Sequence, residues 1–139
     1  MQEPVSLLIA AIRRRMKQVV GEQVREYGLT PAQFWTLNRV FEQEGLSLRE
    51  LADSLHMDTP TASRVVAALV RLKYVRSEED PDDRRRSRIV LSSKGRALAD
   101  KLRPLAVQIR SAVEAPFTAA ERDTLRALLK KSLQHVSRL

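Results

Sequence analysis

The chain has 139 residues, 43% of them hydrophobic, and a formal net charge of +8 from 25 basic and 17 acidic side chains. This length suits one ordinary domain with a hydrophobic core and is too short for two large independent domains. The absence of cysteine excludes disulfides, thiolate metal sites, catalytic cysteines and thiol redox sensing by the chain itself, and it is compatible with a cytoplasmic location.

A long amphipathic helix is predicted over residues 5–27. Apolar side chains recur there mostly at steps of three or four, at Leu8, Ile9, Ile12, Met16, Val19, Val20 and Val24. The helix should end near Gly28. In "LLIAAIRRR" the positive cluster follows the apolar run, which does not fit a signal peptide. The longest apolar runs, 7–12 and 65–70, are far shorter than the roughly 20 residues of a membrane-spanning helix, and we expect no membrane association.

Capping boxes predict where the next two helices begin. "TPAQ" at 30–33 pairs an N-cap threonine with glutamine and puts proline at the first helical position. The helix over 31–43 should bury Phe34 or Trp35, together with Leu37, Val40 and Phe41. "SLRE" at 47–50 repeats the box and opens a short helix to about residue 55.

A fourth helix follows the turn "HMD", with Asp58 as its N-cap and Pro60 in its first turn. Its apolar side carries Val65, Val66, Leu69 and Leu72. After this helix the helical spacing of apolar residues ends. "YVRS" and "RIVL" are short runs rich in β-branched residues, and they lie on either side of a charged stretch. They predict a hairpin with "DPDDRR" at its tip, and with Ile89 and Leu91 facing the helices.

Two further helices complete the predicted order. Ser92 should cap a helix that runs to about residue 115 with an adjustment at Pro104, and "TAAE" at 118–121 is a third capping box, which opens the last helix. The fold class is mainly α with a small β-hairpin (α+β), a helix-turn-helix with a wing. The outer helices are not needed for a winged helix, so their apolar stripes predict a second subunit.

The fourth helix begins with "DTPTASR", which offers the hydroxyls of Thr59, Thr61 and Ser63 and the long donor Arg64. A recognition helix enters the major groove of double-stranded DNA with such N-terminal turns, where small side chains permit close approach and arginine bridges guanine O6 and N7. The alternative is that they are ordinary cap and first-turn residues.

The charged stretch "EEDPDDRRRSR" at 78–88 must lie in water or against a partner of opposite sign. A narrow minor groove attracts an inserted arginine. We expect Arg85 in this role, oriented by Asp83, with Arg84 and Arg86 on the DNA backbone and most of the acids at 78–80 facing away from it. A solvated charged loop is the alternative.

Charge extends beyond the wing. Between residues 84 and 110, nine basic side chains stand against one acid, Asp100. This surplus of positive charge indicates binding to nucleic acid or to an anionic membrane surface. The alternative is a basic face that is only solvated. Ser47 and Arg49 begin the third helix, where amides and a basic side chain commonly meet a phosphate.

No catalytic set is recognisable. His56 and His135 are isolated, so no metal site is expected. The four glycines are dispersed, and no nucleophile sits near a histidine in a known pattern. We therefore expect neither an enzyme nor a cofactor.

The chain resembles the MarR (multiple antibiotic resistance regulator) family of winged-helix repressors. The resemblance rests on "GLTPAQFWTLNRV", "LSLRELADSLHMDTPTASRVVAALV" and above all "DPDDRRRSRIVLSSKGRAL". It implies a homodimer on a palindromic operator, a DNA-binding lobe at 29–91, and a dimerisation lobe at 1–28 and 92–139. It also implies that Asp83 and Arg85 fill the wing-tip positions, and that Pro60, Thr61, Ser63 and Arg64 match the recognition helix.

Two departures from the family pattern stand out. Lys73 replaces the usual glycine after the recognition helix, so either a non-glycine residue is left-handed there or the helix ends differently. The cysteine of the family's peroxide sensors is missing.

The resemblance further implies a small aromatic or anionic effector in a cleft walled by the first, second and fifth helices. Arg14, Phe34 and Trp35 are candidate lining, although Trp35 also suits plain core. We expect a dimeric DNA-binding regulator of the repressor type. The alternatives are a winged-helix protein-interaction module and a non-specific nucleic-acid or membrane-surface binder driven by charge.

Overall fold

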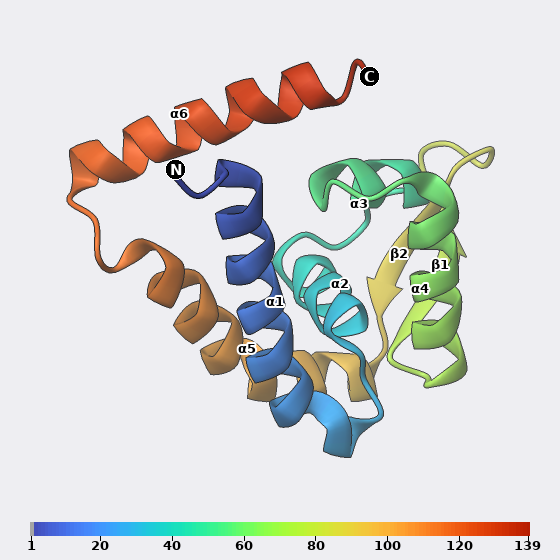
Figure 1. Ribbon diagram of the computed structural model, residues 1–139. Coiled ribbons are helices and arrows are strands. Elements are labelled where there is room, and N and C mark those ends of the chain that lie inside the picture. Colours follow the sequence, from blue (N-terminus) through green and yellow to red (C-terminus); the bar gives the residue numbers. More distant parts are fainter. Residues whose placement is uncertain (1) are drawn as a thin grey trace. The chain divides into compact units, whose positions relative to one another are not determined.

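The computed structural model describes residues 2–139, which are mainly helical with one antiparallel hairpin, as predicted (Figure 1). The elements in order are α1 (Val5–Val24), the 3-10 turn η1 (Arg25–Tyr27), α2 (Pro31–Glu42), α3 (Leu48–Ser54), α4 (Thr59–Arg71), β1 (Val75–Glu79), β2 (Ser87–Leu91), α5 (Ser93–Glu114) and α6 (Ala119–Val136). The chain forms two compact units, one ending at Ala106 and the other spanning Val107–Leu139.

Local hydrogen bonds fix the helix starts. All three predicted capping boxes are present, at Thr30, Ser47 and Thr118. The carboxylate of Asp58 accepts the Thr61 N–H at 2.8 Å at the start of α4. At the end of η1, Gly28 has a φ of 72°, a left-handed conformation that glycine adopts without a steric penalty.

The core of the first unit comes from the helix-turn-helix and from α2, which packs against α1 and α4. Its fully buried side chains include Phe34, Leu37, Leu51 and Leu69. Phe34 is the aromatic residue of α2 that is buried, whereas Trp35 and Phe41 are only partly covered. On α1, Val20 and Val24 are buried, but the apolar residues of its first turns remain exposed: Val5, Leu7, Leu8, Ile9 and Ile12.

The hairpin pairs Val75 with Leu91 and Ser77 with Ile89. Ile89 and Leu91 are buried, but so is Val90 between them, so the predicted alternation does not hold at this end of the strand. Strand β2 also has a second neighbour. Leu46 accepts the Ile89 N–H at 2.8 Å and forms an isolated bridge that the sequence did not reveal.

Helix α4 ends in a left-handed turn at Lys73, whose φ is 65°. The Tyr74 N–H donates to the Leu69 carbonyl at 3.0 Å, and the Lys73 N–H donates to the Val70 carbonyl at 2.9 Å. These two bonds are the Schellman pattern that normally has glycine at the left-handed position. Of the two alternatives left by the sequence, the first is therefore correct.

The start of α5 lies against this turn. Ser92 caps α5 as predicted, because its hydroxyl accepts the Gly95 N–H at 3.0 Å. A Cβ built on Gly95 would lie 1.8 Å from the Tyr74 carbonyl oxygen, so only glycine fits there. Helix α5 continues through Pro104 to Glu114.

In the second unit, Arg126 of α6 pairs with Glu114 at 3.3 Å and with Asp123 at 3.2 Å. Helix α6 buries none of its residues. Its large apolar side chains are exposed: Leu128, Leu129, Leu133 and Val136. Across residues 2–139, none of the helices combines the length and the apolar character needed to cross a membrane.

The left-handed lysine generates a stability prediction. Lys73→Gly should raise the free energy of unfolding by roughly 1 kcal/mol, because a left-handed conformation costs an L-residue about 1–2 kcal/mol and glycine loses part of that gain through its freer unfolded chain. Denaturant titration measures the change. Lys73→Ala is the matched control, since it removes the same charge but keeps a Cβ, and it should not stabilise. Equal stabilisation by both variants would contradict the conformational explanation.

Candidate nucleic-acid interface

Helix α4 has one buried face and one exposed face. Ala62, Val66 and Leu69 are buried against the rest of the helix-turn-helix. At helical periodicity this turns the predicted DNA-reading residues outward: Thr59, Pro60, Ser63 and Arg64 are exposed, and Thr61 is half-buried. The packing of the core therefore presents the first turns of α4 to solvent.

A chain of hydrogen bonds runs along this outward face. The Thr61 hydroxyl donates to Asp58 Oδ2 at 2.9 Å and accepts from Arg64 Nη2 at 3.3 Å. The Thr61 N–H, then its hydroxyl and then the charge of Arg64 lower the pKa of the Asp58 carboxyl. Asp58 therefore stays ionised at neutral pH, and Arg64 is connected to it through Thr61.

Aspartates shape the wing tip through backbone hydrogen bonds. The Asp83 carboxylate accepts the Arg85 N–H at 3.0 Å, and the Asp80 carboxylate accepts the Asp82 N–H at 2.9 Å. The Asp83–Arg85 interaction that the structure shows is thus one with the backbone of Arg85. It fixes the turn from which the Arg85 side chain projects. Arg84 and Arg85 are both exposed, with 92% of the Arg84 side chain accessible.

Glu78, Glu79 and Asp80 have arginine partners on the hairpin itself. Glu78 accepts from Arg88 Nε at 3.0 Å and Nη2 at 2.7 Å, and from Arg76 at 3.5 Å. The hydrogen bond from Arg88 and its charge, with a smaller contribution from Arg76, lower the pKa of Glu78. Glu79 lies 3.9 Å from Arg84. Much of the negative charge of the stretch is therefore balanced locally.

Arg86 connects the wing to α3. Its guanidinium pairs with Glu50, the residue that completes the capping box of α3, and lies 3.6 Å from Asp80. Sequence analysis placed Arg86 on the DNA backbone, whereas the structure engages it in this contact between wing and helix-turn-helix. We call the Glu50–Arg86 pair the wing latch.

The remaining candidates are more scattered. Ser47 uses its hydroxyl to accept the Glu50 N–H at 3.2 Å, and Arg49 is exposed on the first turn of α3. Within residues 2–139, no group of three or more histidine, cysteine, aspartate or glutamate side chains could hold a metal ion.

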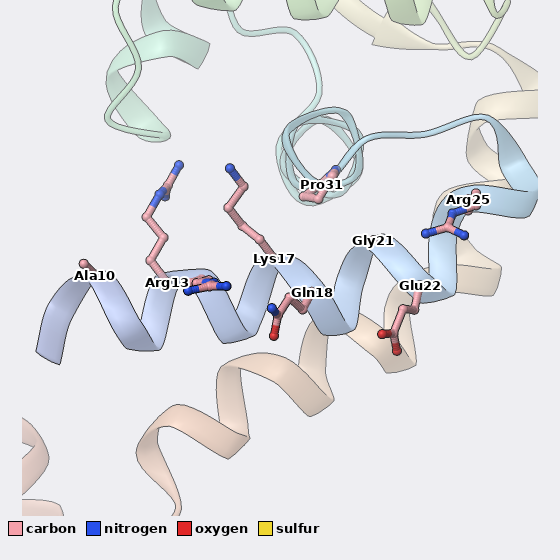
Figure 2. A pocket seen from close by; sticks show the side chains of 9 residues that line it. Ala10, Arg13, Lys17, Gln18, Gly21, Glu22, Arg25 and Pro31 are labelled. Atoms are coloured by element: carbon pink, nitrogen blue, oxygen red, sulfur yellow. The ribbon is translucent and has the colours of Figure 1, made fainter. Parts of the chain in front are cut away.

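Of the expected effector residues, only Arg14 lines a groove. The groove follows α1 and meets Pro31 at the start of α2, as Figure 2 shows. Its cationic lining is Arg13, Arg14, Lys17 and Arg25. Phe34 and Trp35 are not among the residues that line this groove. Phe34 is 1% exposed, and the ring of Trp35 packs edge-on against it with ring centroids 4.8 Å apart, so their role toward an effector stays a prediction.

Sequence reasoning assigned Asp58 and Glu50 only capping roles. Asp58, Thr61 and Arg64 are spaced by three, which places them on one helix face and could have revealed their interaction. The wing latch joins residues 36 positions apart, and no local pattern in the sequence indicates it.

The amino-acid sequence is similar to those of known transcriptional regulators. A sequence model described as MarR family matches residues 27–86. The HTH-type transcriptional repressor NicR of Pseudomonas putida is 30% identical over 131 residues, covering 94% of this chain and 83% of NicR. The HTH-type transcriptional regulator YybA of Bacillus subtilis is 23% identical over 130 residues, covering 94% of this chain and 87% of YybA.

The chain is also similar to solved structures. The MepR–DNA complex of S. aureus aligns with a TM-score of 0.82 at 25% identity, covering 96% of this chain and 99% of that one.

The wing latch generates a prediction for local dynamics. Glu50→Gln keeps an acceptor for the Ser47 N–H and so preserves the capping box, but it removes the charge that attracts Arg86. We expect faster amide hydrogen exchange at residues 80–88 with a stability change below about 1 kcal/mol, because both side chains remain partly exposed, Arg86 by 38% and Glu50 by 49%. Asp53→Asn on the same helix is the charge-matched control and should leave the wing unaffected. Unchanged exchange in Glu50→Gln would mean that the latch does not hold the wing.

Proposed function

This chain belongs to the MarR family and is a non-enzymatic, DNA-binding transcriptional regulator, and we propose that it acts as a homodimeric repressor on a palindromic operator. The observation that carries the proposal is the joint presentation, on one compact unit, of a polar helix start and an arginine-tipped wing. NicR is a transcriptional repressor, which supports repression as the direction of regulation. Such a regulator would work in the cytoplasm, in contact with the chromosome.

We assign the DNA contacts to two elements of a DNA-binding lobe at 29–91. The first turns of α4 enter the major groove, where Thr59, Pro60 and Ser63 permit close approach and Arg64 bridges guanine O6 and N7; Thr61 lies on the same turns, hydrogen-bonded to Arg64. Arg85 enters the adjacent minor groove, and Arg84 meets the phosphates. Asp83 supports the wing turn through its bond to the Arg85 N–H. Arg86 reaches DNA only if it leaves the wing latch, and Ser47 and Arg49 are candidate phosphate contacts.

Dimerisation is supported by the apolar side chains that the chain leaves uncovered. They lie at the start of α1 and along α6. Contiguous exposed apolar side chains of this kind mark interaction surfaces, and residues 1–28 and 92–139 are the lobe that we assign to the second copy. Two-fold symmetry then places the half-sites about 10 base pairs apart.

The groove along α1 supports an anionic effector in preference to an aromatic one, because arginines and a lysine line it. An effector releases DNA only if it binds the DNA-incompetent arrangement of the dimer more tightly than the competent one.

Selection from random duplex DNA tests the proposal. Purified protein is mixed with the pool at about 150 mM salt, where non-specific electrostatic binding is weak, and the bound DNA is sequenced. A palindrome with half-sites about one turn apart is the expected result. An unenriched pool, or equal competition by RNA, would favour a charge-driven binder or a protein-interaction module.

Arg85→Ala should weaken binding to the selected operator by about 1–3 kcal/mol while the melting temperature stays unchanged. The reason is that Arg85 is exposed on the wing tip and its side chain supports no part of the core. Arg138→Ala, which removes an exposed positive charge at the end of the chain, is the control for net charge. Fluorescence anisotropy with labelled operator measures both, and an unchanged isotherm for Arg85→Ala would refute the wing-tip assignment.

A further inference from the structure

We propose that Asp58 is a positioning residue for base recognition, which holds the Arg64 guanidinium through the Thr61 hydroxyl in the direction required to read a base. Asp58, Thr61 and Arg64 together are called the relay. The proposal rests on the function proposed above, because it concerns how α4 discriminates between DNA sequences. In the relay, Thr61 is an intermediary, whereas sequence analysis expected it to contact DNA itself.

The hydrogen bonds of the relay have a defined polarity. Thr61 gives both of its donors to Asp58: the N–H to Oδ1 at 2.8 Å and the hydroxyl to Oδ2 at 2.9 Å. A hydroxyl has one hydrogen and two lone pairs, so with its hydrogen directed at Asp58 it presents a lone pair to Arg64. Arg64 Nη2 donates there at 3.3 Å.

This arrangement goes beyond what a helix cap requires. An N-cap needs one oxygen that accepts a backbone N–H, and aspartate, asparagine and serine supply it about equally well. The second carboxylate oxygen is used only to orient the hydroxyl. The pKa of Asp58 is lowered by the same Thr61 bonds and by Arg64, which keeps the relay in its charged form at neutral pH.

Holding Arg64 before DNA arrives improves recognition for an entropic reason. A long exposed side chain loses rotamer freedom when it binds, and pre-ordering reduces that loss. A guanidinium has five N–H donors, and the relay takes one of them. The rest remain to form the bidentate contact with a guanine edge that distinguishes it from the other bases.

Two variants at Thr61 separate the relay from the cap. Thr61→Val removes the hydroxyl but keeps a β-branched side chain and the backbone N–H that Asp58 accepts. Thr61→Ser restores the hydroxyl without the methyl group. The readout is discrimination, the ratio of affinities for the selected operator and for the operator changed at the base pair where Arg64→Ala loses preference.

Thr61→Val should reduce this discrimination by about threefold to tenfold, the range for one lost hydrogen bond, and Thr61→Ser should stay within about twofold of wild type. Asp58→Asn should reduce it as well. Its amide can still accept the Thr61 N–H but would donate to the hydroxyl in place of accepting from it, which turns the hydroxyl hydrogen toward Arg64. If Asp58 were only a cap, asparagine would preserve discrimination, and the proposal would be wrong.

A double-mutant cycle distinguishes the relay from a direct contact of Thr61 with DNA. In an Arg64→Ala background, Thr61→Val should have no further effect on discrimination, and a persisting effect would overturn the relay. Wild-type protein without any operator preference would overturn both this proposal and the proposed function. Normal preference that is lost in Arg64→Ala but retained in Thr61→Val would overturn the relay alone. Unfolding midpoints of all variants check that the fold is kept.

Discussion

The end of α4 is connected to the hairpin and to α5 at one backbone carbonyl, that of Tyr74. It accepts the N–H of Ser92 at 3.0 Å. The Ser92 hydroxyl donates between the Lys73 carbonyl at 2.6 Å and the Tyr74 carbonyl at 3.1 Å, and Gly95 approaches the Tyr74 carbonyl too closely for any side chain. The end of α4, the start of β1, the end of β2 and the start of α5 meet at this point. A rotation of α4 therefore requires movement of the wing and of the first turns of α5. In the proposed homodimer, this connection would allow a change at the dimer interface to alter the spacing of the two α4 helices.

The DNA-reading surface is built on that connection by packing and by polar contacts. Burial of Ala62, Val66 and Leu69 fixes which face of α4 turns outward. The wing latch between Glu50 and Arg86 sets the wing against α3, and the relay acts at the level of a single side chain. Each of these arrangements restricts the conformation of the protein before DNA binds. Less conformational entropy is then lost on binding, which is how pre-organisation improves affinity.

Local chemistry explains what the sequence could predict. Capping boxes and Asp58 act over three residues, so every predicted helix start was correct. Features that depend on distant parts of the chain were missed. Val90 is buried against the expected alternation, Leu46 bridges to β2, and Arg86 is engaged by Glu50. The sequence left open whether Phe34 or Trp35 is the buried residue for the same reason. The local sequence does not indicate which of two adjacent aromatic residues on a helix faces the core.

Dimethyl sulfate footprinting on the selected operator tests the central claim most directly, because the reagent reports guanine N7 in the major groove and adenine N3 in the minor groove. We expect protected guanines in two major grooves about 10 base pairs apart, with protected adenines in the minor grooves beside them. Tight binding that leaves these purine positions fully reactive would show that the protein contacts only the phosphate backbone. That result would contradict base reading by α4 and the wing.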